Sequence, residues 1–446
     1  MNGSEHNATP TAAIARPIAT AGEVFTDGVT IELVSGVNPG HLQLMLWDGL
    51  NEISGTAVEY HGQLYEAPKI EGSLLRQLTL PTRCCPHGST REFLTETCDI
   101  MKNLVGLDEK SASLAARIVL CSAIVDALSI APALVIAGPD TARANRLMTL
   151  LRCLCWRSVF LTSVTPASFC SLANGVRFTF LISQTNVSDK LRKLLDDSSN
   201  RDRKIPYRGR LLDLFGVQVI HSDSLFIADS WPLRSIQISV TPTNTALPDF
   251  GQDAQQRIAT QFQQKLLSFR RANLGAARRL NFDESNFSPT LRDLARSLAA
   301  ATPDDAELQA EVIELLREED SESRSARWTD LHVIAVEAVL TAYKESPGEA
   351  VYVGELANIA ETLLNGRGKN SEVDPGPFGK LLKMLHFVTE PRDAKGVKLL
   401  LTEAVRTHAL QLARHLEIPG CEAPSLARPE TTPQECCEKS NSILAM

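Results

Sequence analysis

Residues 133–152 hold a short apolar run, a glycine turn and a helical pattern in immediate succession, and this order limits the fold more than any other feature of the chain. Residues 133–137 are apolar throughout, which is typical of a strand buried on both faces. Gly138 and Pro139 end that run, and leucines at helical spacing follow from Leu147 to Leu154. Strand, turn and helix in this order predict a doubly wound α/β core.

The turn at Gly138 has the spacing of a P-loop but lacks the residues that touch phosphate. In a working P-loop, a glycine and four further residues precede Gly-Lys-Ser/Thr; the lysine reaches the phosphates and the hydroxyl holds magnesium. Arg143, Ala144 and Asn145 occupy those last three places here. A purely structural turn explains the same residues, because Asp140 or Thr141 would cap the following helix. The sequence leaves both interpretations open.

The rest of the chain divides into segments of different pattern. Short alternating runs between turn residues predict a small β unit before the core. Further buried strands and, after them, amphipathic helices follow the P-loop-like turn. Three helices and a hairpin near the C-terminus describe a winged helix. The predicted divisions are 1–22, a disordered lead; 23–80, a small β unit; 81–250, a degenerate P-loop α/β core; 251–325, a helical lid and acidic connector; 326–418, a winged helix; and 419–446, a disordered tail.

Charge is unevenly distributed along the 446 residues, although the formal net charge is only −8. Residues 81–280 carry 25 Lys or Arg against 16 Asp or Glu, which permits a polyanionic partner such as DNA. The acidic runs at Asp304–Asp305 and 318–320 are assigned to solvent.

The sequence disfavours a membrane-spanning protein and a zinc-binding protein. The apolar stretch 115–137 contains Arg117, Asp126 and Pro132, which a membrane-spanning helix would hardly tolerate, so we expect a cytoplasmic protein without a membrane partner. The ten cysteines lack the paired spacing of zinc sites, so we expect no metal site.

The order of these landmarks resembles that of helicase-like P-loop proteins of phages and mobile elements, which are related to primase-helicases and AAA proteins. The likeness covers residues 88–300 and rests on order and spacing. It implies that the acidic pair of the family's second strand falls on Ser183 and Gln184, and that a phosphate-sensing arginine is retained as Arg234. It implies a phosphate-binding loop at Gly138, Pro139, Asp140, Thr141, Arg143 and Asn145, with Arg146 nearby and the lysine position at Ala144.

Three of those four chemical positions are altered. Phosphoryl transfer depends on positioning and on neutralising charge, so replacing the lysine and both acidic groups removes most of its means. The resemblance therefore implies a degenerate nucleotide site in a core that keeps the family's fold.

Two groups of basic residues are candidate nucleic-acid contacts. Between residues 190 and 210, eight Lys or Arg accompany three Asp, an arrangement that suits a phosphate backbone or, equally, a solvated loop. The second group lies on the third helix and the hairpin of the predicted winged helix, whose net charge of −1 also suits protein contact. The candidates are Lys190, Arg192, Lys193, Arg201, Arg203, Lys204, Arg208 and Arg210, and then Lys380, Lys383, Arg392, Lys395 and Lys398.

The preferred interpretation is a non-catalytic or weakly active scaffold that is associated with nucleic acid or has a regulatory role. ATP and magnesium stay open as cofactors, DNA as a partner, and other proteins or further copies of the chain as additional partners. One alternative is an ATPase or helicase that places Arg143, Arg146 and Arg234 around the phosphates. The other is an adaptor that binds protein only.

Overall fold

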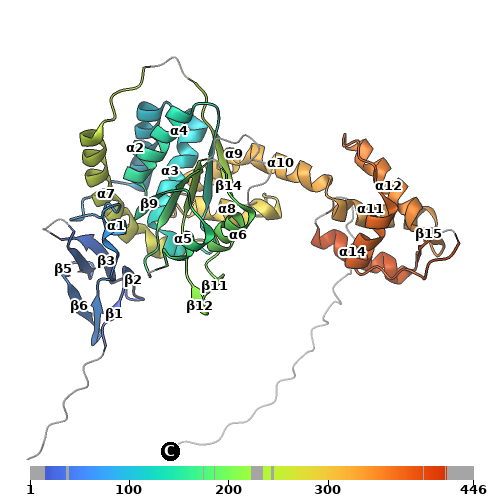
Figure 1. The fold of residues 1–446 in the computed structure, drawn as a ribbon, viewed down its shortest axis with the longest axis horizontal. Coiled ribbons are helices and arrows are strands. Elements are labelled where there is room, and N and C mark those ends of the chain that lie inside the picture. The colour runs from blue at the N-terminus through green and yellow to red at the C-terminus, as the bar shows by residue number, and fades with distance from the viewer. Residues whose placement is uncertain are drawn as a thin grey trace, which may run out of the picture. The chain divides into compact units, whose positions relative to one another are not determined.

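The computed structural model describes residues 16–36, 40–173, 175–184, 186–221, 235–242, 246–394, 396–416 and 418, without the side chains of residues 325–328. The chain forms two compact units, Met1–Ser321 and Glu322–Met446 (Figure 1). Each unit buries a hydrophobic core of its own, and no cluster of buried apolar residues is shared between them in the described parts of the chain.

Two small sheets form the N-terminal part of the first unit. One is antiparallel and joins β2 (Gly22–Val24), β3 (Thr30–Ser35), β4 (Leu42–Trp47) and β5 (Glu52–Gly55). The other joins β1 (Ile18–Ala19), β7 (Gln63–Glu66) and β6 (Ala57–Tyr60), with β1 parallel to β7. A short helix, α1 (Gly72–Leu75), follows.

The disordered lead predicted for residues 1–22 needs correction over its last part. Strand β1 lies within it, and the Thr20 N–H donates to the Glu66 carbonyl at 2.9 Å. Pairing with β7 orders this segment despite its lack of a hydrophobic pattern. The rest of the predicted lead, residues 1–15, lies outside the described residues. The predicted tail, residues 419–446, lies outside them as well.

Five parallel strands form the sheet of the core. Their order is β14-β8-β13-β10-β9, for β8 (Ala133–Ala137), β9 (Ser158–Thr162), β10 (Thr179–Ser183), β13 (Gln218–His221) and β14 (Ser235–Ser239). All five residues of β8 are buried, as expected for a strand that is covered on both faces. The predicted doubly wound α/β core is confirmed.

Successive residues of β8 serve opposite faces of this sheet. Leu134 and Ile136 belong to a core that includes α2 (Thr90–Val105), α3 (Glu109–Ala123), α4 (Thr141–Leu154) and α7 (Gln252–Arg278). Val135 belongs to a second core that includes α5 (Pro166–Cys170), α6 (Asp189–Ser198) and strand β3. Helices α7 and α8 (Pro289–Ala299), which the sequence predicts to be part of a lid, share the first core with α2, α3 and α4.

The connections around β8 define the edge at which such sheets bind ligands. From β8 the chain passes through α4 to β9 at the far edge, whereas from β13 it passes to β14 on the other side of β8. The carboxyl ends of β8 and β13 therefore form the switch point of the sheet.

Local capping explains where several helices begin. Ser89 accepts from the Glu92 N–H, and the Glu92 side chain accepts from the Ser89 N–H, so a capping box starts α2. Helix α3 ends at Ala123, and a 3-10 turn covers Val125–Ala127.

The acidic connector is only partly solvated: the Glu318 side chain is 80% exposed, as its assignment to solvent predicts, whereas Asp305 is 18% exposed, which corrects its assignment. Helices α9 (Ala306–Leu315) and α10 (Arg317–Trp328) carry it. Asp305 caps α9 and pairs with Arg91 at 2.7 Å, while Glu318 pairs with Lys110 at 2.6 Å. The connector is thus tied by its charges to α2 and α3, because basic residues far away in sequence meet it.

From Leu331 on, the described residues of the second unit form four helices and a small antiparallel strand pairing. Its elements are α11 (Leu331–Glu345), β15 (Ala350–Tyr352), α12 (Val353–Gly366), α13 (Pro375–Met384), β16 (Lys398–Leu400) and α14 (Glu403–His415). Strand β15 pairs with β16, and Thr389 bridges Leu399, which closes the predicted hairpin. Within the described residues, no helix combines the length and apolar character needed to cross a membrane.

Candidate functional site

The turn after β8 is shaped by the neighbouring strand. Gly138 has a φ of 128°, and a Cβ atom built there would lie 2.2 Å from the carbonyl oxygen of Val240. The Val240 N–H in turn donates to the Ala137 carbonyl at 2.7 Å. Only glycine permits this conformation and this close approach of the chain beyond β14. The glycine therefore has a structural explanation that requires no phosphate.

The loop between β8 and α4 is also short. Because α4 begins at Thr141, only Pro139 and Asp140 separate Gly138 from the helix. The Asp140 carboxylate accepts from the Arg143 N–H at 2.9 Å and so caps the helix, as the structural interpretation predicts. A carboxylate at this helix N-terminus places negative charge where a bound phosphate would gain from the helix dipole.

Both arginines of the P-loop-like segment bind carbonyl groups at the end of another helix. Arg143 donates through Nε to the Val105 carbonyl at 2.6 Å, and through Nη2 to the Gly106 carbonyl. Arg146 donates to the Leu104 carbonyl. These three carbonyls lie at the C-terminal end of α2, whose dipole favours positive charge. The two guanidinium groups thus hold α2 against α4.

The remaining positions of the segment do not converge on a common point. Ala144, at the position of the P-loop lysine, is fully buried in the core shared by α2, α3, α4 and α7. Thr141 and Asn145 are exposed. A side chain at position 144 therefore faces apolar residues, which is a poor environment for an ammonium group.

The positions of the family's acidic pair are occupied by residues that connect loops. Ser183 Oγ lies 3.2 Å from His221 Nδ1 across the β10–β13 pairing. Gln184 Oε1 accepts from the Val164 N–H at 2.7 Å, and its Nε2 donates to the Asn186 carbonyl at 2.8 Å. Both side chains fix the carboxyl end of the sheet. Arg234 lies outside the described residues.

The basic segment 190–210 is brought into one region but is partly neutralised by its own acidic residues. Arg203 pairs with Asp197 at 2.8 Å, and Lys204 pairs with Asp213 at 2.8 Å. Arg192 pairs with Asp189 at 3.5 Å. Lys190 and Lys193 are exposed on α6. Three of the eight predicted basic residues are therefore engaged in ion pairs within the protein.

The last residues of this segment form a hairpin. Strands β11 (Ile205–Tyr207) and β12 (Arg210–Leu212) are antiparallel, and Arg208 and Gly209 turn between them with φ of 48° and 75°. The Arg208 guanidinium lies 5.3 Å from the centre of the Tyr207 ring. Arg208 and Arg210 are exposed, and Leu211 beside them is 73% exposed. The hairpin thus presents two cations and an apolar side chain to solvent.

In the second unit, three of the predicted basic residues line one groove. Lys380, Lys383 and Arg392 border a depression of about 740 Å³ together with the N-terminal residues of α12. Lys398 instead pairs with Glu390 at 3.1 Å. Lys395 lies outside the described residues.

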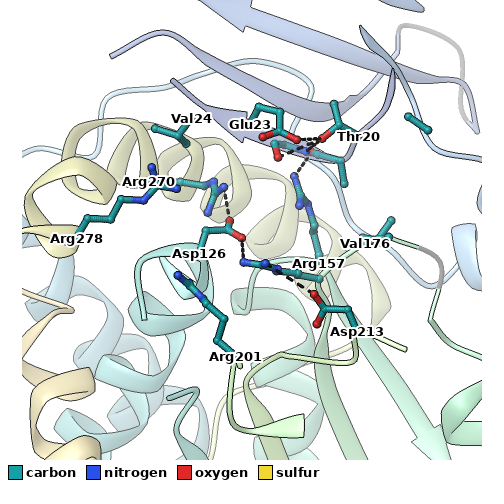
Figure 2. Close-up of a pocket in the computed structure, with 15 residues that line it drawn as sticks. Thr20, Glu23, Val24, Asp126, Arg157, Val176, Arg201, Asp213, Arg270 and Arg278 are labelled. Carbon is teal, nitrogen blue, oxygen red and sulfur yellow. Dashed lines mark hydrogen bonds and ion pairs between the residues drawn. The ribbon is translucent and has the colours of Figure 1, made fainter. Parts of the chain in front are cut away.

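A cavity at the opposite end of the core sheet was not predicted from the sequence. It has a volume of about 340 Å³ and is lined by residues that precede strands β8, β9, β10 and β13, and by residues of β2 and α7. Figure 2 shows Asp126 near the centre, with Arg270 and Arg201 on either side of it. Its charged residues are Glu23, Asp126, Arg157, Arg177, Arg201, Asp213, Arg270 and Arg278.

Ion pairs organise most of these charges. Arg270 binds both Glu32 and Asp126, and Arg157 binds Glu32 at 2.9 Å. Burial would raise the pKa of the Asp126 carboxyl, but Arg270 and Arg177 hold it well below its usual range. Burial lowers the pKa of the Arg201 guanidinium, and the nearby Arg177 and Arg278 lower it further. Arginine charge is thus concentrated here more densely than carboxylate charge.

Comparisons with known proteins give structural matches alone. No family model matches the chain, and no curated protein matches its sequence. The A-form apo C-terminal region of NrS-1 is 11% identical with a TM-score of 0.36, over 84% of this chain and 97% of that chain. SCCmec type IV Cch, described as an active helicase, is 11% identical with a TM-score of 0.36, over 87% of this chain and 95% of that chain. A full-length MCM homolog from Methanopyrus kandleri is 12% identical with a TM-score of 0.32, over 65% and 78%.

Proposed function

We propose that the chain is a helicase-like P-loop protein that does not turn over nucleotide and acts as a nucleic-acid-associated or regulatory scaffold. One observation carries this proposal: the groups around the P-loop-like turn are already used in structural contacts. Asp140 caps α4, and Arg143 and Arg146 bind carbonyls at the end of α2. Phosphoryl transfer needs cationic groups and a metal at the transferred phosphate. The contacts support a core that is kept for its shape.

Exposed cations on the β11–β12 hairpin support the nucleic-acid part of the proposal. Among the described residues, Arg208 and Arg210 form no ion pair with a carboxylate, and both face solvent. Cations that are not paired internally can neutralise backbone phosphates and release the counterions bound there. Tyr207 lies beside Arg208 and offers a ring on which a base could stack.

The second unit contributes a further candidate contact. We assign it as a winged helix, because its helices and hairpin follow one another in that order. Lys380 and Lys383 on α13 and Arg392 on the hairpin line one groove, which is where such a unit meets a duplex. The groove of the C-terminal unit is thus a second proposed nucleic-acid contact, argued for that unit by itself.

Nucleotide titration tests the non-catalytic part. Calorimetric titration of the full chain with ATP, with and without magnesium, is expected to give no magnesium-dependent binding, and phosphate release is expected to match that of buffer. Tight magnesium-dependent binding of ATP would instead establish the alternative of an ATPase with an unconventional site.

Salt-dependent binding tests the nucleic-acid part. We expect affinity for DNA oligonucleotides to fall steeply with salt, and the double variant R208A/R210A to reduce the slope of log affinity against log salt by about 1.5. The matched control R152A/R257A removes two exposed arginines elsewhere in the first unit and is expected to change the slope little. No DNA binding at low salt would leave the protein-binding adaptor as the better explanation.

A further inference from the structure

The arginine-lined cavity at the amino ends of β9, β10 and β13 is separate from the P-loop-like turn, which lies at the carboxyl end of the same sheet. We propose that this cavity binds a phosphate monoester group, with Arg201 and Arg278 as its principal ligands. The proposal does not depend on whether the chain binds nucleic acid through its hairpin.

Charge balance gives the first reason. Five arginines and three carboxylates line the cavity. The lining groups also bind two residues outside it, Glu32 and Lys204, so the set becomes six cations and four anions. A surplus of two positive charges is left in a confined space. A phosphate monoester carries about −1.5 to −2 charges at pH 7, whereas a phosphodiester carries one, so the surplus matches the monoester.

Donor groups without partners give the second reason. Arg157 is 3% exposed, and its Nε is a buried donor without a hydrogen-bond partner. The Arg201 Nε is in the same position, since the guanidinium donates only through Nη2 to the Val125 carbonyl at 2.9 Å. Arg278 lines the cavity with an exposed side chain that, among the described residues, makes no hydrogen bond or ion pair. The buried Nε donors of Arg157 and Arg201 are costly unless something accepts from them.

A purely structural role accounts for only some of these arginines. Arg157 and Arg270 both bind Glu32 of β3, so they attach the N-terminal sheets to the core. Among the described residues, Arg201 and Arg278 make no hydrogen bond or ion pair with β3. Besides burial, repulsion from Arg177 and Arg278 lowers the pKa of the Arg201 guanidinium. Guanidinium groups that repel one another are stabilised by a shared anion, and their planar donors suit the oxygens of phosphate.

The carrier of the phosphate has two candidate sources with the same chemistry. Arg201 and Asp213 stand at the two ends of the segment that contains the β11–β12 hairpin, so the cavity opens beside its base. A nucleic-acid strand lying on the hairpin could insert a terminal phosphate. A free phosphorylated compound could enter in the same way, since the cavity of about 340 Å³ exceeds what a phosphate alone requires.

Calorimetric titration of the full chain with inorganic phosphate, against chloride of equal ionic strength, tests the cavity directly. We expect wild-type protein to bind phosphate. R278A is expected to bind it at least about tenfold more weakly, because one charge-assisted hydrogen bond is lost. The control R279A removes the neighbouring exposed arginine of the chain, which does not line the cavity, and is expected to bind as wild type. R201A is expected to lose binding as well; if it unfolds by circular dichroism, R278A still decides.

Absence of phosphate binding in the millimolar range, or equal affinity in wild type and R278A, would overturn the proposal. A second arm compares an oligonucleotide bearing a 5′-phosphate with the same sequence bearing a 5′-hydroxyl. If strand ends supply the phosphate, wild type prefers the phosphorylated form and R278A loses that preference. If both forms bind equally while inorganic phosphate still binds, a free phosphorylated compound is the source. If wild-type protein binds neither oligonucleotide but still binds inorganic phosphate, the proposed nucleic-acid function is wrong and the cavity proposal is retained.

Discussion

The two ends of the core sheet handle charge in opposite ways. At the carboxyl end, the charged side chains next to Gly138 bind backbone groups at helix ends. Asp140 caps the start of α4, and Arg143 donates to a carbonyl at the end of α2. At the amino end, arginines outnumber carboxylates around a cavity, and some of their donors have no partner. The charged residues beside the P-loop-like motif therefore make structural contacts, whereas the cavity that we propose as a phosphate site lies outside any motif.

The largest effect that would test this comparison comes from the ion network behind the cavity. Arg270 is 1% exposed and binds Glu32, which is fully buried, as well as Asp126. In R270M both carboxylates lose their main partner, so we expect the first unit to lose about 3–5 kcal/mol of stability in urea unfolding.

The exposed Arg257 on the same helix supplies the control, and R257M is expected to change stability by less than about 0.5 kcal/mol. A cost for R270M below about 1 kcal/mol would mean that the network is not sealed from water. The contrast between a used and an available set of arginines would then break down.

A second large effect is expected at the carboxyl end. In G138A the new Cβ meets the Val240 carbonyl and the backbone must keep a φ that alanine disfavours, so we expect a loss of about 3 kcal/mol or more. G209A is the matched control, because Gly209 has a φ of 75° with nothing within 4 Å of its Cβ position, and should cost about 1 kcal/mol. Equal costs for the two variants would remove the structural explanation of Gly138.

The sequence predicted the elements of this fold better than its charged cavity, for a physical reason. The strand 133–137, the turn and the capping residue Asp140 act on neighbours within four residues, so their signals are local. Arg157, Arg201 and Arg278 come from three distant segments, and only the sheet order brings them together. The same applies to the ion pair between Glu318 and Lys110, which joins α10 to α3 although the Glu318 side chain is 80% exposed. A single sequence carries no pattern for such meetings.

An acid-dependent loss of stability is expected from Asp126. Burial would raise the pKa of its carboxyl, yet Arg270 and Arg177 hold that pKa far below its unfolded value. A carboxyl of this kind stabilises the fold above about pH 4, and the contribution disappears as the pH falls towards the folded pKa. D126N lacks the titrating group, so its urea midpoint should be lower at pH 7 but should fall less steeply below pH 4. Parallel curves for the two proteins would show that Asp126 is not held by the arginines.

The smallest expected effect tests whether the cap at α4 hides an anion site. D140A removes the carboxylate that accepts from the Arg143 N–H, and should cost about 1 kcal/mol, whereas T141A at the exposed neighbouring position should cost less than about 0.5 kcal/mol. Removing the negative charge also leaves the helix N-terminus open to phosphate. We nevertheless expect D140A to show no magnesium-dependent ATP binding in calorimetry, because Arg143 stays bound to the carbonyls of α2 and Ala144 stays in the core. If D140A does bind ATP, a phosphate site is present at the start of α4 and only the Asp140 carboxylate blocks it. The contrast between the two ends of the sheet would then depend on that one residue.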